Sequence, residues 1–375
     1  MKKVMIVTTS IGTEEVFRKF LSEYSRIKTD GFEVKMVIIG DINTPKVDFD
    51  SLGELKSLKQ AGFDFEFLSA EDQVDLMKSK PFMHDLIPWK KVQRRNLGYM
   101  MAYQGNYDYV ITVDDDNFPL DPLFIKKHID KLGMHKDLEI ISPKNNTISW
   151  FNPCSPLPHN VVHRGFPNER LYTDQEFIKK SGPGRVVVSE GLWLGDPDIT
   201  ALSRWEGNPQ NIKITDKDLE DLKDNYCLSF LLKSPHNTQN TAYIREVIPA
   251  LFLSAKNGRY DDIWASYFLK ALMYIKEDLI SFGYPLVRQD RNDHDILHDL
   301  ELELYGMRHT VEFVDELFEL AHGKKKEFSR LSYLELTRKM ADIMIKKSVR
   351  FSWYYLDVTR WIELLENDAG KTHTD

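Results

Sequence analysis

The 375-residue chain is predicted to form an α/β fold with a mostly parallel central sheet flanked by helices. Two observations support this prediction. Short apolar runs such as Val4–Thr8 and Val34–Ile39 would be hydrophobic on both faces, which is typical of strands buried in a parallel sheet. Between such runs the apolar residues have helical spacing, and strands that alternate with helices favour parallel pairing.

The expected elements follow one another in a regular order through the first 113 residues. They are a strand over 4–8, a helix over 14–27, strands over 34–39 and 65–68, a helix over 91–103 and a strand over 109–113. In such sheets, ligands bind at the carboxyl ends of the strands. The polar residues that fall at these ends, and are therefore candidates for a binding site, are Thr8, Thr9, Ser10, Asp41, Asp114, Asp115 and Asp116.

The rest of the chain is predicted in less detail. Residues 145–240 are rich in Pro, Asn and Gly, and we expect loops and short antiparallel strands that wall a site. Helical patterns occur near 216–224, over 261–277 and from 307 to the end, with a break at 324–326. We therefore predict a catalytic domain over 1–300 and a helical extension over 301–375. The apolar faces of that extension either cap the domain or make a dimer.

Composition excludes several classes of protein. The net charge of −8 argues against a nucleic-acid-binding surface. Two cysteines, Cys154 and Cys227, make no disulfide framework, which favours a cytoplasmic protein. The apolar run near the N-terminus is too short for a signal peptide, and no stretch approaches the 18 apolar residues of a membrane span.

Three consecutive aspartates, Asp114 to Asp116, directly follow the predicted strand over 109–113. Like charges at one strand end repel one another unless a cation lies among them. A divalent ion held by carboxylates and by substrate phosphates satisfies that requirement. The alternative is a solvated turn, in which aspartate is common.

Three further segments have both a functional and a structural interpretation. Lys90, Lys91, Arg94 and Arg95 form either a solvated helix face or a contact to a diphosphate or a uracil. Asp261 and Asp262 either complement a helix dipole or face a reacting sugar, with Trp264 as a sugar platform. The segment 188–198, which contains Trp193, forms either a loop beside a ligand or a buried turn.

Taken together, these segments resemble the reversibly glycosylated polypeptide family, whose plant members act as UDP-arabinopyranose mutases and glycosylate themselves. The matching segments occur in the family's order over roughly residues 87 to 290. They are 87–90, 95–99, 109–118, 164–167, Ser189 with 191–194, 197–198, 240–243 with Arg245, and 258–262 with 264–265.

The resemblance implies a GT-A (Rossmann-like) glycosyltransferase fold, a UDP-sugar donor, and Mn²⁺ or Mg²⁺ at an Asp-x-Asp (DXD) motif. Asp114 and Asp116 would hold the metal, and Lys90 and Arg95 would contact the donor. Further donor contacts are expected from the strand-end residues 8–10, 41 and 115 and from Trp193 and Asn240. Catalytic roles are expected for Asp261 and Asp262.

The chain also departs from the family pattern at three places. The family's glycosylated arginine has its nearest counterpart in Arg170, one position off, with Arg185 as an alternative. Glu190 stands where the family has a histidine. A family histidine that could ligate the metal is replaced by Gln289, with His294 and Asp290 nearby as candidates.

Three functions are therefore weighed. The leading one is a metal-dependent glycosyltransferase that moves a sugar from a nucleotide-diphosphate donor to a carbohydrate or other hydroxyl acceptor. The second is a UDP-sugar pyranose–furanose mutase with a transient adduct at Arg170. The third is a non-catalytic partner that only binds nucleotide sugar, against which the clustered aspartates argue.

Overall fold

The computed structural model describes residues 1–78, 80, 82–155, 161–172, 175–206, 214–215, 217, 226–290 and 295–366, without the side chains of 284–285. Its strands are β1 (Lys2–Thr9), β2 (Phe32–Ile39), β3 (Phe63–Leu68), β4 (Tyr109–Val113), β5 (Asn117–Pro119), β6 (Gly133–Pro143), β7 (Ser149–Trp150), β8 (Phe177–Gly195), β9 (Tyr226–Leu228), β10 (Leu232–Lys233), β11 (Asn240–Ile244) and β12 (Leu279–Gln289).

The helices lie between and after these strands. They are α1 (Glu14–Tyr24), α2 (Gly53–Gln60), α3 (Ala70–Lys78), α4 (Met83–Leu86), α5 (Arg95–Gln104), α6 (Phe124–Ile129), α7 (Ala201–Glu206), α8 (Asp261–Lys276), α9 (Ile296–Phe328), α10 (Tyr333–Lys347) and α11 (Ser352–Glu366). Short 3₁₀ turns include η2 (Val92–Arg94), η4 (Asn168–Arg170) and η7 (Gly258–Tyr260).

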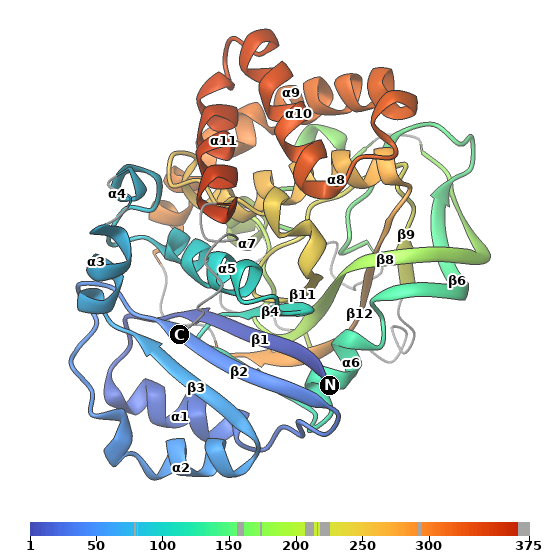
Figure 1. The fold of residues 1–375 in the computed structure, drawn as a ribbon. Helices are drawn as coiled ribbons and strands as arrows, with labels where there is room; N and C mark the ends of the chain where they lie inside the picture. The colour runs from blue at the N-terminus through green and yellow to red at the C-terminus, as the bar shows by residue number, and fades with distance from the viewer. Residues whose placement is uncertain are drawn as a thin grey trace.

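One large sheet organises the fold, and its strand order is β3-β2-β1-β4-β11-β8-β6-β9-β12-β5. The first four strands in that order pair in parallel, whereas β11 runs antiparallel to β4 and opens a mixed half. The predicted fold class is confirmed, with an all-parallel N-terminal half and a mixed half in which β8 and β12 also pair in parallel. Figure 1 shows α1 and α2 on one side of these strands and the C-terminal helices on the other.

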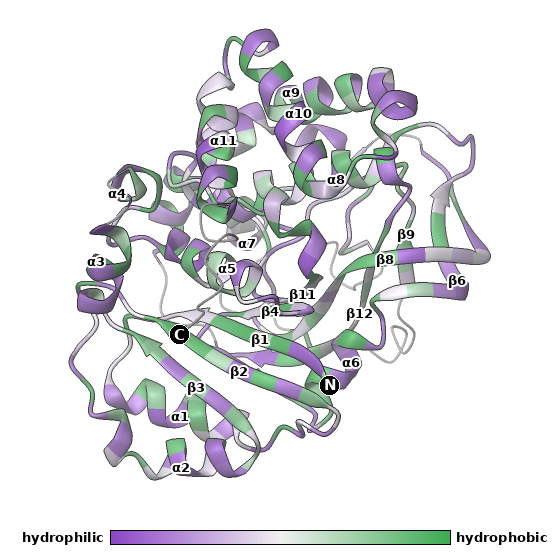
Figure 2. Ribbon diagram, in the orientation of Figure 1, coloured by the Kyte–Doolittle hydropathy of each residue, from purple (hydrophilic) through white to green (hydrophobic). Residues whose placement is uncertain are grey.

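Close packing fixes helix α5 on strand β1. A Cβ atom added to Gly98 of α5 would lie 2.3 Å from Val7, so only glycine permits this approach. On the opposite face, α1 buries Phe17, Phe20 and Leu21 against the sheet. Figure 2 shows the resulting pattern, with hydrophobic strands and helices that are hydrophobic on one side.

The middle of the sheet differs from expectation. The short antiparallel strands predicted over 145–240 are replaced in part by β8, a single strand of 19 residues. Its outer half pairs with β6, and its inner half pairs with β11 and β12. The segment Gly182–Gly184, which reads as a turn in the sequence, lies inside this strand. The helical pattern near 216–224 lies almost wholly outside the described residues.

The C-terminal helices cover α8, whose residues are all buried except the last. Trp264 of α8 stacks on Phe313 of α9 at 4.1 Å between ring centroids and meets Tyr354 of α11 edge-on. Tyr355 and Trp361 of α11 are likewise buried, so these aromatic residues cap the domain.

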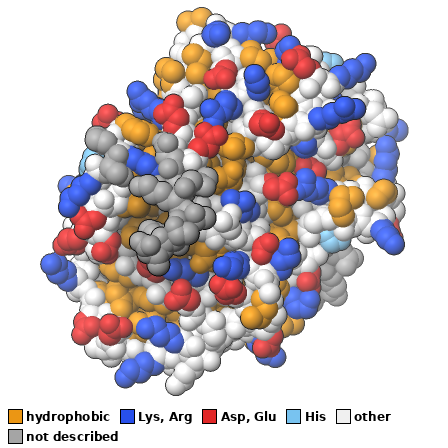
Figure 3. Space-filling model, viewed as in Figure 1, with side chains coloured by type: hydrophobic (Ala, Val, Ile, Leu, Met, Phe, Trp, Pro, Cys, Tyr) orange, Lys and Arg blue, Asp and Glu red, His pale blue; other side chains and the backbone are white. Residues whose placement is uncertain are grey.

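Helix α9 runs for 33 residues and passes through Lys324 to Lys326, so the break predicted there is wrong. Lys324 pairs with Glu327, and Lys325 pairs with Glu277 while its ammonium lies over the rings of Phe230 and Tyr274. Within the described ranges, no helix is long and apolar enough to span a membrane. Figure 3 shows acidic and basic side chains interspersed on one face, with no patch of a single sign.

Candidate functional site

Two adjoining pockets lie where the sequence predicted a site, at the carboxyl ends of β1, β2 and β4. The small pocket, of about 260 Å³, is lined by residues that include Thr9, Ser10, Asp41 and Asp115. The large pocket, of about 530 Å³, is lined by Arg95, Asp114, Arg164, Thr238, Arg259, Asp261, Asp262, His298 and Leu302, among others. Both pockets share Lys90, Lys91 and Val92, so one ligand can extend through both.

The three aspartates at the end of β4 turn to three different partners. Asp114 accepts a hydrogen bond from Arg95, and Asp115 accepts one from Ser10. Asp116 accepts a hydrogen bond of 3.3 Å from the side chain of Asn117. Burial raises the pKa of Asp115, and the charge of Asp114 raises it further. Asp114 therefore lines the large pocket and Asp115 the small one, whereas Asp116 lines neither.

The oxygen atoms near Asp116 have the chemistry of a site for a hard divalent ion. Gln289 is buried, its amide oxygen has no partner among the described residues, and it lies opposite Asn117 in the pairing of β12 with β5. The described residues contain no ready-made group of three His, Cys, Asp or Glu ligands. Asp116 and Gln289 line neither of the two pockets, so an ion held by Asp114, Asp116 and Gln289 stays a prediction. His294 lies outside the described residues.

The basic segment before α5 divides into two groups. Arg94 and Arg95 are buried: Arg94 stacks on Trp89 at 3.5 Å and donates to Gln73, whereas Arg95 pairs with Asp114. Lys90 and Lys91 face the pockets, and no ion pair engages either lysine in the part of the chain described. Lys90 has a left-handed backbone with φ of 58°, a strained conformation that recurs at functional sites. The lysines are therefore available to an anionic ligand.

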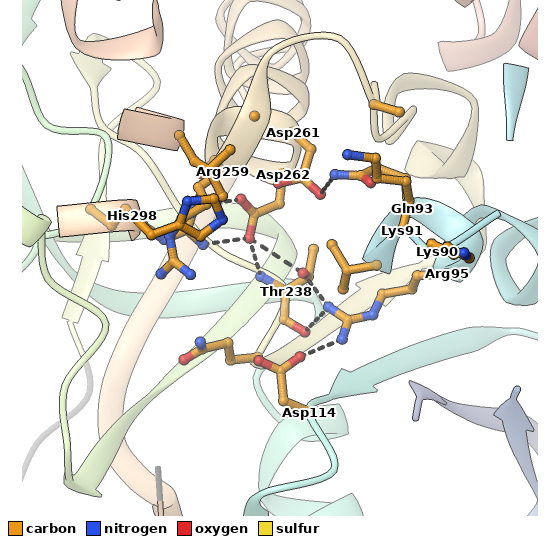
Figure 4. A pocket seen from close by; sticks show the side chains of 16 residues that line it. Lys90, Lys91, Gln93, Arg95, Asp114, Thr238, Arg259, Asp261, Asp262 and His298 are labelled. Carbon is orange, nitrogen blue, oxygen red and sulfur yellow. Dashed lines mark hydrogen bonds and ion pairs between the residues drawn. The ribbon is translucent and has the colours of Figure 1, made fainter. Parts of the chain in front are cut away.

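The two adjacent carboxylates of α8 have separate roles. Asp262 receives two hydrogen bonds of 2.9 Å from the guanidinium of Arg164, together with bonds from the backbone and hydroxyl of Thr238. Asp261 accepts one side-chain hydrogen bond, of 2.8 Å, from Gln93. Figure 4 shows both carboxylates at the wall of the large pocket. The carboxylate of Asp262 is thus occupied by hydrogen bonds from other protein residues. Asp261 is the carboxylate that can react with a ligand.

The environment of Asp261 gives it a pKa suited to proton transfer. Burial and then the negative charge of Asp262 raise the pKa of Asp261 to about 7, against the opposing charges of Arg164 and Arg95. A carboxylate that titrates near neutral pH can accept a proton from a substrate hydroxyl.

A buried network of ion pairs and hydrogen bonds connects to Asp262 through Arg164. Arg164 also donates to Asp198 at 2.9 and 3.0 Å, and Asn237 donates to the same carboxylate. Burial alone would raise the pKa of Asp198, but the charge and hydrogen bonds of Arg164 lower it to about 2. His163 contacts the backbone of Arg164 at 2.7 Å and the carboxylate of Glu190 at 3.2 Å. Glu190, where the related family has histidine, belongs to this buried layer.

Several residues predicted for the site lie elsewhere. Trp264 is in the aromatic core, so its proposed role as a sugar platform is wrong. Trp193 is buried beside His163, and Asn240 is buried against His128. Thr8 is buried at the end of β1. None of the four is among the residues that line the two pockets.

Arg170 lines a third pocket, together with Trp150, Phe151 and Tyr172. Its guanidinium lies 5.9 Å from the centre of the Trp150 ring and 3.8 Å from the carboxylate of Asp315. Among the described residues, this third pocket shares no lining residue with the large one. The structure therefore does not bring Arg170 together with Asp261.

Sequence reasoning missed the roles of several lining residues. Gln93 and Thr238 were not singled out, because an isolated amide or hydroxyl carries no motif. Arg164 was noted as part of a matching segment, but its pairing with Asp262 depends on a contact across 98 positions of sequence. His298 and Leu302 come from α9, which places the C-terminal helices at the pocket wall.

Two glycines allow α9 to reach this wall. A Cβ atom on Gly306 would lie 2.0 Å from the ring of Tyr260, and one on Gly258 would lie 2.1 Å from the carbonyl oxygen of Leu302. Gly258 also has a left-handed backbone with φ of 63°. Helix α9 therefore lies directly against η7, the turn that leads into Asp261.

Comparison with known sequences confirms the resemblance stated above. The chain is 26% identical over 331 residues to UDP-arabinopyranose mutase 3 of Arabidopsis thaliana, covering 84% of this chain and 82% of the relative. It is 25% identical over 312 residues to UDP-arabinopyranose mutase 1 of Oryza sativa subsp. japonica, covering 80% and 78%. No family model matches the chain. Because these relatives are mutases, the prediction of an enzyme is confirmed.

Solved structures also align with most of this chain, and two examples follow. Glucosyl-3-phosphoglycerate synthase from Mycobacterium tuberculosis, in complex with Mn²⁺, UDP-glucose and phosphoglyceric acid, is 11% identical with a TM-score of 0.41, covering 85% of this chain and 80% of that one. S. aureus TarS 1-349 in complex with UDP-GlcNAc is 12% identical with a TM-score of 0.35, covering 98% and 91%.

Proposed function

We propose that this enzyme binds a nucleotide-diphosphate sugar, in the first instance a UDP-sugar, across the two adjoining pockets and breaks the bond between the sugar and the diphosphate. The observation that carries the proposal is the order of groups along the joined pockets. Ser10 and Asp41 line only the small pocket, Lys90 and Lys91 line both pockets, and Asp261 lines only the large one. That order matches a nucleoside, a diphosphate and a sugar.

The charges in the middle of the site suit a departing diphosphate. Lys90, Lys91 and a divalent ion, Mn²⁺ or Mg²⁺, would offset the negative charge that develops there, which is usually the largest catalytic contribution. The ion would be held by Asp114, Asp116 and Gln289 and would act as a Lewis acid when bound. Arg95 holds the carboxylate of Asp114 through their ion pair.

The fate of the sugar that the geometry supports best is transfer to a hydroxyl acceptor. Asp261 has a raised pKa and lines the larger pocket, which has room beside a donor sugar for a second molecule. Its carboxylate would remove the acceptor's proton as the acceptor oxygen attacks the anomeric carbon. The acceptor would enter past His298 and Leu302 of α9, which also line this pocket.

A second candidate is a UDP-sugar pyranose–furanose mutase, because that is the activity named for the relatives at 25–26% identity. This function uses the same donor site and the same cleavage step. An adduct at Arg170 finds no support in the structure, because Arg170 lines a separate pocket. The buried, unpaired cysteines fit the cytoplasmic location that we propose for either activity.

One experiment separates these functions. The purified protein is incubated with Mn²⁺ and a panel of UDP- and GDP-sugars, with and without simple glycoside acceptors, and the products are resolved by chromatography. Release of nucleoside diphosphate that an acceptor stimulates supports transfer. Exchange of ring form without net release of nucleotide supports the mutase. If neither reaction occurs with any donor, the transferase and the mutase are both contradicted. Binding without turnover would favour a non-catalytic partner.

We expect Asp116→Asn to remove the metal dependence of nucleotide binding. The wild type should bind UDP about tenfold or more tightly with Mn²⁺ than without it, because the ion links carboxylate to phosphate. The variant should bind equally with and without the ion, as measured by calorimetry. Asp342→Asn, at an exposed carboxylate of α10, serves as the control and should behave as wild type. Metal dependence that survives Asp116→Asn would contradict the assignment.

The rate of sugar transfer should rise with pH through neutrality. Asp261 accepts a proton only when ionised, and its pKa of about 7 means that the ionised fraction grows about tenfold per pH unit below that value. The single-turnover rate should therefore increase up to about pH 7 and level off above it. A rate that falls over the same range would instead make Asp261 a proton donor.

A further inference from the structure

We infer that the amide oxygen of Gln93 accepts a hydrogen bond from a hydroxyl group of the donor sugar, and that Gln93 is therefore a specificity-determining residue. The inference rests on the proposed function and deepens it, because it assigns the part of the large pocket that recognises the sugar. Gln93 lies in η2, directly after the two lysines at the junction of the pockets.

Hydrogen bonding fixes the orientation of the Gln93 side chain. Its amide nitrogen donates to the Oδ2 atom of Asp261 at 2.8 Å, as Figure 4 shows. When Asp261 is ionised, as it must be to act as a base, its oxygens can only accept, so the nitrogen of the amide faces Asp261 and the oxygen points elsewhere. The side chain is only 4% exposed, which restricts it further.

The amide oxygen of Gln93 is buried and has no hydrogen-bond partner among the described residues. Buried polar atoms are seldom left without a partner, because each one costs about 1–3 kcal/mol. Gln93 lines the large pocket, so a ligand in that pocket can supply the missing donor. Sugar hydroxyls are donors of the required kind.

The position of Gln93 indicates that its partner is the sugar and not another part of the ligand. The diphosphate, whose oxygens only accept hydrogen bonds, belongs beside Lys90 and Lys91 and offers nothing to an amide oxygen. Asp261, which Gln93 holds, is the carboxylate assigned to the reacting sugar. A hydroxyl adjacent to the anomeric centre would thus meet Gln93 while Asp261 faces the acceptor.

The test compares the affinities for UDP and for a UDP-sugar by calorimetry. The probes are UDP and whichever of UDP-glucose, UDP-galactose, UDP-N-acetylglucosamine and UDP-arabinopyranose the wild type binds most tightly. We expect Gln93→Met to weaken binding of the UDP-sugar by about tenfold or more, since one hydrogen bond is lost and apolar surface faces a hydroxyl. Binding of UDP should change by less than about twofold.

Two variants control for indirect effects. Gln104→Met makes the same substitution on α5, where the amide donates to the backbone of Leu364, and should leave both affinities unchanged. Gln93→Glu keeps an acceptor oxygen in place and should retain UDP-sugar binding at acidic pH, where one proton is shared with Asp261. Monodeoxy analogues of the sugar identify the hydroxyl: removing the correct one should weaken binding to the wild type and not to Gln93→Met.

The outcomes separate the two proposals. If the wild type does not bind UDP, the proposed function fails. If UDP binds but no UDP-sugar binds more tightly, or if every deoxy analogue loses the same affinity in the wild type and in Gln93→Met, the inference about Gln93 is overturned. In that case an ordered water molecule satisfies the amide oxygen.

Discussion

Asp261→Asn should reduce the turnover rate by about 10²–10⁴-fold, the range typical of a lost general base. The substitution keeps the size of the side chain and its ability to accept a hydrogen bond from Gln93, and removes only its ability to take up a proton. Binding of UDP should be unchanged, because Asp261 lies on the sugar side of the large pocket. Stopped assays of nucleotide release, with calorimetry of UDP binding, measure both quantities.

The free energy of unfolding shows whether a loss of turnover in Asp261→Asn comes from the missing carboxylate or from misfolding. The carboxylate of Asp261 is buried next to that of Asp262, so replacing it by an amide removes a repulsion and should not lower the free energy of unfolding. The paired control is Asp262→Asn, which weakens two hydrogen bonds from Arg164 and should destabilise the fold. Normal turnover by Asp261→Asn would refute the assigned role.

Arg164→Met should destabilise the fold by about 3–5 kcal/mol, because it leaves the buried carboxylates of Asp198 and Asp262 without their counterion. The free energy of unfolding is measured by denaturant titration. The sign of the pH dependence follows from Asp198. In the wild type, Arg164 lowers the pKa of Asp198 to about 2, so the stability from this pair is present at neutral pH and is lost as the pH falls toward 2.

A matched substitution tests whether burial causes the effect. Arg18 pairs with Glu14 and Glu54 on the surface of α1, so Arg18→Met should change the free energy of unfolding little. The variant Arg164→Met should also lose the acid sensitivity assigned to Asp198. Equal effects of the two substitutions would mean that the buried network does not stabilise the protein.

The sequence predicts well those parts of the fold whose signal is local. Strands β1, β2 and β4 are largely apolar, although β2 contains Lys35, and α1 has regular amphipathic spacing, so these elements are recognisable without tertiary information. The aspartates after β4 follow a predicted strand end for the same reason, whereas the lysines before α5 are recognisable only by their charge.

The parts that could not be predicted depend on contacts between distant segments. Gly182 and Gly184 suggest a turn, yet β6 pairs along that stretch and makes it part of a long strand. The aromatic side chain of Trp264 is of the type that stacks on sugars, and only the packing of α9 and α11 shows that it is buried. Asp261 and Asp262 are chemically identical in sequence, and only Arg164 distinguishes their roles.

The contact between Gly306 and Tyr260 has a consequence for how this enzyme can diversify. Any side chain at position 306 would push α9 away from the turn before Asp261, because a Cβ atom there would lie 2.0 Å from the tyrosine ring. Helix α9 contributes His298 and Leu302 to the large pocket, so its displacement would widen that pocket. A single change at this position, about one helical turn from Leu302, the nearer of these two lining residues, is thus a route by which descendants of this enzyme would accommodate bulkier molecules in the large pocket.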